Sequence, residues 1–178
     1  FNEALLFDYM LKNTENAELK TYLLASRVDD LLATLFRQTM FAEYEHKAHA
    51  MLEAGEALTL DALRSEYGKL LSKYFGTAMV FEESSNLEGL RIPHFYNSYY
   101  VYKYATGISA SIALSKKVLA GEPEALDNYF AFLKSGGSRF PIEALKVAGV
   151  DMSEPAPVEA ACREFGRLVE ELAKALKL

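Results

Sequence analysis

The sequence contains a single cysteine, Cys162, among 178 residues. One cysteine cannot form an intrachain disulfide and cannot supply a multi-cysteine zinc site. These limits exclude an extracellular disulfide scaffold. We therefore expect the protein to work in a reducing compartment, the cytoplasm.

The sequence also lacks a basic excess and a long apolar run. Nineteen Lys and Arg residues stand against 25 Asp and Glu residues, which gives a net charge of -6 at pH 7. No basic field therefore exists to attract a phosphate backbone, and we expect no nucleic-acid partner. No apolar run approaches the roughly 20 residues that cross a bilayer, so we expect a soluble protein without a membrane partner.

Apolar residues at helical spacing are what the sequence has in quantity. They make up 51% of the chain beside 25% charged residues, which is ordinary globular usage and excludes disorder as the main state. Almost every segment has a 3.6-residue period, and no run alternates as a half-buried strand does. The sequence predicts an all-α fold, with residues 1–178 forming a single helical region. The expected helices are 17–53, 59–75, 96–119, 123–135, 141–149 and 158–176, and residues 82–93 are expected to form a loop that leads into a site.

The first residues of the chain already belong to a helical pattern. The opening FNEALLFDYMLK has apolar residues at helical spacing and no initiator methionine. Such a start is typical of a cut inside a helix, so we expect the 178 residues to be the C-terminal part of something larger. We also expect the cut to expose apolar surface near Phe1 and Tyr99, and exposed apolar surface favours self-association.

The most unusual segment is RIPHFYNSYYVYKYATG, residues 91–107, which has five tyrosines between His94 and Tyr104. Tyr99 and Tyr102 are three residues apart, so on a helix their hydroxyls project from nearly the same face, with His94 just before the helix. Several phenolic donors and an imidazole can then converge on one point. For any single ring, packing into the core is the alternative, because burial is the default for aromatic side chains.

The run EYEHKAH suggests a metal site, because Glu43, Glu45, His46 and His49 include three- and four-residue spacings. Such spacings can bring Glu and His side chains to one cation. Nothing nearby specifies the third ligand that a two-histidine zinc site needs, so we favour a solvated helix face. With three histidines and one cysteine, no Ser/His/Asp or Cys/His arrangement is supported, and we expect no hydrolytic nucleophile in this chain.

Several blocks of the sequence together resemble one known family. FNEALL begins the chain, FRQTMFAEYE lies in the long helix, RIPHFY and YYVYKYATG form the centre, and YFAFLKSGGSRFPIEALKVAGVDM lies toward the end. In this order the blocks resemble the C-terminal region of oligoendopeptidase F, and they span nearly the whole chain. The resemblance implies a zinc metallopeptidase related to thimet oligopeptidase, almost wholly helical, with a deep channel that admits peptides and excludes folded proteins.

The same resemblance implies that the zinc ligands lie outside this chain. In the family, two histidines and the general-base glutamate come from an HExxH helix, and a third ligand, a glutamate, comes from a run similar to EIASTFNE. The last three residues of that run match Phe1, Asn2 and Glu3, which implies a ligand upstream of Phe1 and a supporting role for Glu3. We therefore expect no metal ligand here and a chain that is inactive alone, with zinc and the upstream part of the same polypeptide completing the enzyme.

The central segment matches a motif that the family places over its zinc site. Thimet-type enzymes have a histidine and a Tyr-Tyr-x-Tyr motif there, and Tyr99, Tyr100 and Tyr102 match that motif, with His94 upstream. The resemblance implies that Tyr102 stabilises the oxyanion that forms when the peptide carbonyl is attacked. It implies that Tyr99 and His94 hydrogen-bond the peptide backbone or the same oxygen.

Two further positions complete the expected site, and two functions remain open. Tyr96 is expected to line a subsite, and Gly107 to let a peptide approach its helix closely. In the first function, the chain supplies the substrate-binding and oxyanion-stabilising part of a cytoplasmic zinc oligoendopeptidase that cleaves short peptides at internal bonds. In the second, it is a helical peptide-binding or packing module without catalysis.

Overall fold

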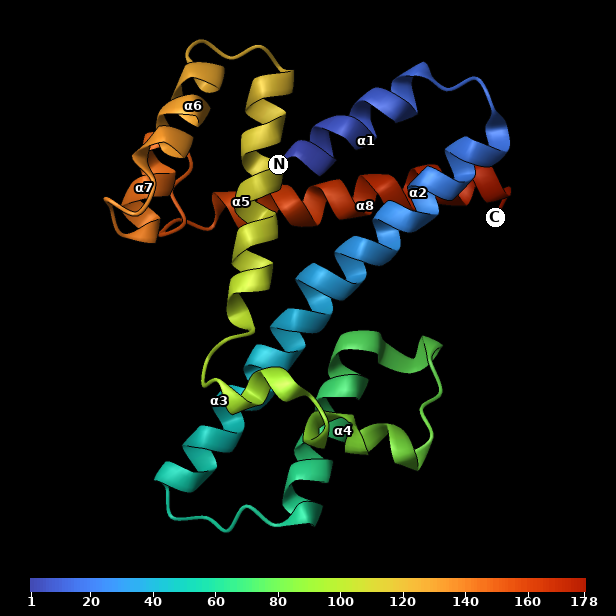
Figure 1. Cartoon of the computed structure of the whole chain (residues 1–178). Coiled ribbons are helices and arrows are strands. Elements are labelled where there is room, and N and C mark those ends of the chain that lie inside the picture. Colours follow the sequence, from blue (N-terminus) through green and yellow to red (C-terminus); the bar gives the residue numbers. More distant parts are fainter. The chain divides into compact units, whose positions relative to one another are not determined.

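The computed structural model describes all residues from Phe1 to Leu178, and every regular element in it is a helix (Figure 1). The α-helices are α1 Asn2–Asn13, α2 Ala17–Leu31, α3 Gln38–Glu53, α4 Leu60–Phe75, α5 Tyr102–Leu119, α6 Ala125–Ser135, α7 Pro141–Val147 and α8 Ala156–Leu176. A π-helical segment, η1 Leu32–Arg37, joins α2 to α3, and three 3₁₀ helices are η2 Gly76–Ala78, η3 Glu83–Leu90 and η4 Pro93–Tyr96. The all-α prediction is confirmed. None of these helices combines the length and the apolar character that crossing a membrane requires.

The chain folds as two compact units. The terminal unit comprises Phe1–Leu32 and Thr106–Leu178, and the middle unit comprises Ala33–Ala105. Both boundaries fall within helical segments, one at the start of η1 and the other in the first turns of α5.

In the terminal unit, α1 contacts α2, α2 contacts α8, and α6 contacts α7. The Phe1 ring stacks on the Tyr129 ring with their centroids 3.8 Å apart, which ties the first residue to the core of this unit. Gly149 follows the end of α7 with φ 84°, a left-handed conformation that glycine adopts without strain, as the sequence predicted for this helix end. One cluster of buried residues in this unit is formed by Ala110, Leu114, Tyr129, Ala148 and Val150.

In the middle unit, α4 contacts both α3 and η3. The Thr59 side chain accepts a hydrogen bond from the Ala62 amide at 3.2 Å, so it caps α4 as the sequence predicted. The core between these elements is aromatic and aliphatic: Met40, Phe41, Tyr44, Tyr67, Leu70, Leu71 and Val101.

The segment that the sequence predicted as a loop, residues 82–93, is largely helical, because η3 occupies most of it. Its composition is that of a loop, but contacts with α4 order it. Arg64 pairs with Glu83 at 2.6 Å, and the Tyr67 hydroxyl donates to Glu88 at 2.6 Å. Long-range contacts of this kind override local preference, and the loop prediction was wrong here.

Glu88, in the last turn of η3, is the centre of a polar cluster. Its carboxylate pairs with Arg37 and accepts the hydrogen bond from Tyr67, while Arg91 lies 3.4 Å away. Tyr67 is fully buried, and burial together with the nearby carboxylate raises the pKa of its phenol well above the usual range. The hydroxyl therefore stays a donor at every ordinary pH, and it holds η3 to the core.

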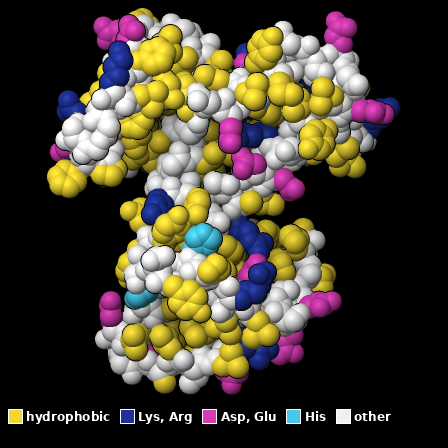
Figure 2. Space-filling model, viewed as in Figure 1, with side chains coloured by type: hydrophobic (Ala, Val, Ile, Leu, Met, Phe, Trp, Pro, Cys, Tyr) yellow, Lys and Arg dark blue, Asp and Glu magenta, His cyan; other side chains and the backbone are white.

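Large apolar side chains remain at the surface of both units (Figure 2). In the terminal unit Tyr9 and Tyr22 are about two thirds exposed, and Phe140 is 79% exposed. In the middle unit Val80 is 96% exposed. Surfaces with many such side chains are typical of regions that contact further protein.

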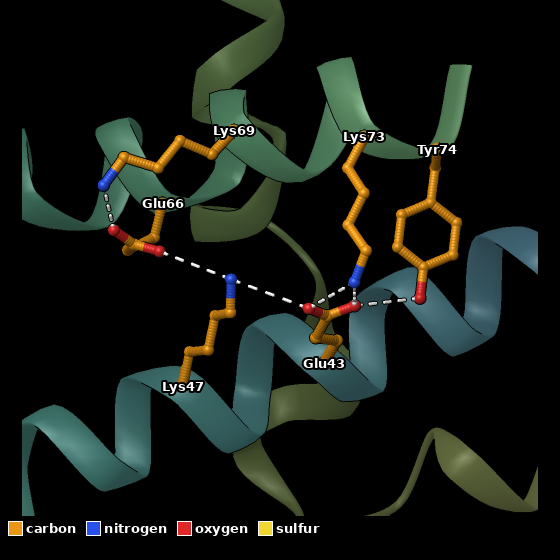
Figure 3. Close-up of polar contacts among 6 residues, drawn as sticks. All are labelled: Glu43, Lys47, Glu66, Lys69, Lys73 and Tyr74. Atoms are coloured by element: carbon orange, nitrogen blue, oxygen red, sulfur yellow. Dashed lines mark hydrogen bonds and ion pairs between the residues drawn. The ribbon is translucent and has the colours of Figure 1, made fainter. Parts of the chain in front are cut away.

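Opposite charges join α3 to α4 along one face (Figure 3). The Glu43 carboxylate accepts hydrogen bonds from the Lys73 ammonium at 2.8 Å and from the Tyr74 hydroxyl at 3.0 Å. Lys47 lies between two carboxylates, 3.6 Å from Glu43 and 3.7 Å from Glu66. The bond from Lys73 lowers the pKa of Glu43, while burial and the bond to Glu43 raise the pKa of Tyr74 to about 12.

A methyl group at Gly89 should disturb the core of the middle unit. A Cβ atom there would lie 2.8 Å from carbon atoms of both the Tyr44 and the Tyr67 ring. We expect Gly89→Ala to lower the free energy of unfolding by about 1 to 3 kcal/mol, because both rings are fixed by packing. Urea denaturation measures the change.

Gly107→Ala is the matched control for stability, since a Cβ at Gly107 meets no atom within 4 Å. Alanine favours a helix over glycine by up to about 1 kcal/mol, so this variant should be as stable as the parent or slightly more stable. Equal stability of Gly89→Ala and the parent would contradict the packing of η3 against the two rings.

The negative charge of Glu43 should stabilise the folded state only at a pH above the pKa of its carboxyl group. The folded state lowers the pKa of Glu43 below the ordinary value of 4.5, so its stabilising effect is present at higher pH and is lost as the pH falls through the folded pKa. Glu43→Gln should lower the free energy of unfolding by up to about 1 kcal/mol near neutral pH, with the difference vanishing in acid. Urea denaturation at several pH values measures this. A loss that is the same at every pH would assign the effect to shape and not to charge.

Candidate functional site

The tyrosine-rich segment runs from η4 to the start of α5 in the middle unit. Pro93 occupies the first turn of η4, and His94 in the same element is exposed. Three of the predicted site residues are open to solvent: Tyr96 is 88% exposed, Tyr102 is 54% exposed and Tyr99 is 46% exposed. These rings do not belong to the core of the middle unit.

Tyr99 lies in a turn and not in a helix. Its φ is 57°, in the left-handed region that few residues other than glycine adopt, and α5 begins only at Tyr102. The prediction that the helix starts near Tyr96, with the hydroxyls of Tyr99 and Tyr102 on one helical face, was therefore wrong. Val101, between the two tyrosines, is fully buried in the core, which fixes the end of this turn.

Glu45 on α3 holds the turn through a hydrogen bond to its backbone. Its carboxylate accepts a hydrogen bond from the Tyr99 backbone amide at 2.6 Å, and the residue is only 5% exposed. One helical turn further along α3, the His49 ring stacks on the Tyr99 ring with centroids 4.8 Å apart. The prediction of a solvated face was right for His46, which is exposed, but wrong for Glu45.

The four-residue spacing of Glu45 and His49 was visible in the sequence and placed both on one face of a helix. Their common partner was not visible, because Tyr99 lies 54 residues from Glu45 along the chain. Sequence reasoning therefore considered these two side chains for a metal and missed their contact with the tyrosine segment.

His94 contacts a different pair of tyrosines from the pair that the sequence suggested. Its Nε2 atom lies 3.2 Å from the Tyr104 hydroxyl, and its ring centroid lies 5.3 Å from that of Tyr100. The Tyr104 hydroxyl also donates to the Tyr100 hydroxyl at 3.5 Å, and this bond raises the pKa of Tyr104. Sequence reasoning did not select Tyr104, because the matched motif ends at Tyr102.

The remaining predicted residues lie in the terminal unit. Glu3 is exposed in the first turn of α1. Gly107 is exposed in α5, and open space surrounds the position of a Cβ there. A ligand can therefore approach the backbone of α5 at Gly107 without meeting a side chain of the chain itself.

The chain does not bring together the residues of a zinc site. No group of three or more His, Cys, Asp and Glu side chains is placed to hold a metal ion. In the EYEHKAH run, Glu43 is engaged by Lys73, and Glu45 by the Tyr99 amide. What the middle unit offers is a set of exposed phenols and an imidazole, which can hydrogen-bond the carbonyl and amide groups of a peptide.

Known proteins similar to this chain are peptidases. The chain is 48% identical over 175 residues to oligopeptidase PepF of Bacillus subtilis, and 42% identical over 173 residues to an oligoendopeptidase F homolog of Borreliella burgdorferi. These matches cover 98% and 97% of this chain, but 26% and 29% of the two relatives. The crystal structure of oligoendopeptidase-F from Enterococcus faecium matches with a TM-score of 0.96 at 44% identity, over 99% of this chain and 34% of that one.

This chain thus spans between a quarter and about a third of the length of these relatives. The sequence model of peptidase family M3 matches residues 1–164, which is most of the chain. The matches with the relatives cover nearly the whole chain. The chain belongs to peptidase family M3.

Proposed function

We propose that this chain is the C-terminal part of a zinc-dependent oligoendopeptidase that hydrolyses internal bonds of short peptides. The observation that carries the proposal is the match of nearly the whole chain to one part of longer oligopeptidases, with His94, Tyr99 and Tyr102 exposed within the match. Exposed donors without a nucleophile or a metal cluster suit the substrate-binding half of an active site. The rest of the site would come from the remainder of the longer polypeptide.

In this proposal Tyr102 donates a hydrogen bond to the oxygen of the scissile carbonyl. Negative charge grows on that oxygen as the carbonyl is attacked, and a fixed donor stabilises the charge more strongly than it stabilises the neutral carbonyl. Tyr102 suits this role because its ring is half exposed and its backbone is fixed at the start of α5, next to the buried Val101.

Tyr99 and His94 hydrogen-bond the backbone of the bound peptide, and Tyr96 lines a subsite. The hydrogen bond and ring contact from Tyr104 orient the His94 imidazole, so that its ring is held while an edge stays exposed. Gly107 lets the peptide approach α5 closely, because no side chain surrounds that position.

The zinc of the proposed enzyme is held by ligands outside this chain, since the residues of the chain do not form a metal site. When bound, zinc activates water and polarises the carbonyl group. Glu3 supports the ligand set from the first turn of α1. An enzyme of this kind would work in the cytoplasm, where the free and exposed Cys162 stays reduced.

The apolar side chains at the surface are covered by the remainder of the longer polypeptide in this proposal. Isolated from it, the chain would associate with itself through the same surfaces, because exposed apolar area favours association. With the remainder of the polypeptide in place, the exposed tyrosines would face a closed space that binds the peptide.

The proposal is tested by comparing this chain with an extended protein, in which the chain follows the upstream part of its own polypeptide. We expect the extended protein, and not the chain alone, to cleave a quenched-fluorescent peptide in the presence of zinc. A zinc chelator should abolish the cleavage. Cleavage by the chain alone would contradict the proposal, and a folded, zinc-loaded extended protein that binds peptides without cleaving them would favour the non-catalytic module.

The role of Tyr102 is tested by Tyr102→Phe in the extended protein. The substitution keeps the ring and removes a hydrogen bond that is made mainly in the transition state, so kcat should fall with little change in KM. By analogy with the removal of other oxyanion donors, we expect a loss of roughly 10²- to 10³-fold, or about 3 to 4 kcal/mol. Steady-state kinetics on one peptide measure both constants.

Tyr100→Phe is the matched control for that substitution. The Tyr100 ring is half-buried against the core, and its hydroxyl faces that of Tyr104, so its removal should reduce kcat far less. Equal losses in the two variants would indicate a general disturbance of the tyrosine segment. A near-normal kcat in Tyr102→Phe, at unchanged zinc content and stability, would remove the assigned role.

A further inference from the structure

The backbone of Tyr99 adopts a conformation that its own residue type disfavours. A φ of 57° brings the side chain of a residue other than glycine close to its own backbone, so such a residue needs outside contacts to keep it there. Tyr99 is nevertheless among the residues that the proposed function assigns to substrate binding. Something in the middle unit must hold it in place.

The Glu45 carboxylate supplies the first contact. The Tyr99 amide donates to it at 2.6 Å, and no helix or strand would otherwise pair this amide in the turn. A charged acceptor makes a stronger hydrogen bond than a neutral one, and burial of Glu45 keeps water from competing for it. The contact acts on the backbone and leaves the phenol of Tyr99 free to face a ligand.

The His49 imidazole supplies the second contact, on the ring. The two rings are stacked, with an interplanar angle of 28° and centroids 4.8 Å apart. His49 follows Glu45 by four residues on α3, so both side chains project from the same face of one helix. With one face of its ring against His49, Tyr99 as a whole is still 46% exposed.

We propose that Glu45 and His49 are positioning residues for substrate binding, which act by fixing the backbone and the ring of Tyr99. The inference rests on the proposed function, because it gives Tyr99 a peptide to bind. Helix α3 is itself held firmly, since Tyr44, beside Glu45, is buried in the core, and Glu43 is bonded to Lys73 and Tyr74 of α4. Contacts with a rigid helix therefore hold the turn that carries Tyr99, and the position of Tyr99 does not depend on the flexible backbone of the turn alone.

The backbone contact is tested in the extended protein with two substitutions of Glu45. Glu45→Gln keeps an oxygen that accepts a hydrogen bond, whereas Glu45→Met has a similar length and no good acceptor. We expect Glu45→Met to lower kcat/KM by about 10- to 100-fold, mainly through KM, and Glu45→Gln to retain most of the activity. Glu53→Gln, at the exposed C-terminal end of the same helix, should leave kcat/KM unchanged. Equal losses for Gln and Met would contradict the acceptor role.

A double-substitution cycle separates positioning from a general structural role. If Glu45 acts through the Tyr99 hydroxyl, Glu45→Met should cost little further activity once Tyr99→Phe has removed that hydroxyl. Losses that multiply in the double variant would mean that Glu45 acts independently of Tyr99, and they would overturn the proposal. Zinc content and melting temperature are compared in all the variants.

The ring contact is tested by His49→Phe and His49→Ala. Phenylalanine keeps an aromatic face for stacking, whereas alanine removes it, so Phe should restore most of the kcat/KM that Ala loses. His49 is partly exposed, so neither variant creates a large buried cavity. A His49→Ala variant with the kinetics of the parent would remove His49 from the proposal.

Hydrogen exchange of the Tyr99 amide, resolved by mass spectrometry with fragmentation, gives a readout that needs no activity. Exchange should be slow in the parent, slow in Glu45→Gln and fast in Glu45→Met, while amides in the middle of α4 stay protected in all three. Unchanged exchange in Glu45→Met overturns the positioning. If exchange responds as expected but Tyr99→Phe keeps the parent's kcat/KM, the role of Tyr99 in the proposed function fails instead, and Glu45 and His49 then hold a turn without a part in binding.

Discussion

The hydrogen bond from the Tyr99 amide to the buried Glu45 carboxylate is the constraint on which the tyrosine-rich segment depends. It lets a bulky residue stay in the left-handed region within the turn that joins η4 to α5. Without an acceptor at this place, the amide would lose its hydrogen bond to the carboxylate, and the turn would lose its contact with α3. A side chain on one helix thus determines the backbone conformation of a segment that lies 54 residues later in the chain.

The turn also places neighbouring residues of the segment in different environments. Val101 is buried among the core rings, and burial of a valine side chain contributes about 1.5 to 3 kcal/mol to folding. Tyr100 and Tyr104 face His94, whereas Tyr99 and Tyr102 keep about half of their surface exposed. One short run of residues therefore supplies a buried valine that fixes the segment, two tyrosines that orient His94, and two exposed phenolic donors. A regular helix through all of these positions would place them differently, because every residue would then follow the same 100° rotation.

The helices themselves were predictable because their signals are local. Apolar spacing predicted α4, and Thr59 predicted its capped start; proline and glycine predicted the limits of α7. Two of the departures come from contacts between residues far apart in sequence. The η3 helix is ordered by Tyr67 and Arg64 of α4, and Tyr99 is ordered by Glu45. The π-helical segment Leu32–Arg37 was not predicted, and the apolar spacing around it is that of an ordinary α-helix.

The membership of the candidate site stays a prediction, and its geometry could not be predicted from the sequence. The sequence selected His94, Tyr96, Tyr99 and Tyr102 from a resemblance, and their exposure in the structure is compatible with ligand binding. It could not give their geometry, since the pairing of His94 with Tyr104 and of His49 with Tyr99 follows from the turn. Residues that act through others, such as Glu45, have no motif of their own and are visible only once the fold is known.

The exposure of Tyr102 has a further physical meaning under the proposed function. A phenol that is open to water donates its hydrogen bond to water molecules. Its interaction with a developing charge is also weak where the dielectric constant is high. The same donor becomes effective when surrounding protein excludes water and lowers the local dielectric constant. A chain that fixes Tyr102 in place but leaves it 54% exposed therefore supplies the geometry of an oxyanion donor without its full strength. Under the proposed function, that strength would come from the protein that encloses the site.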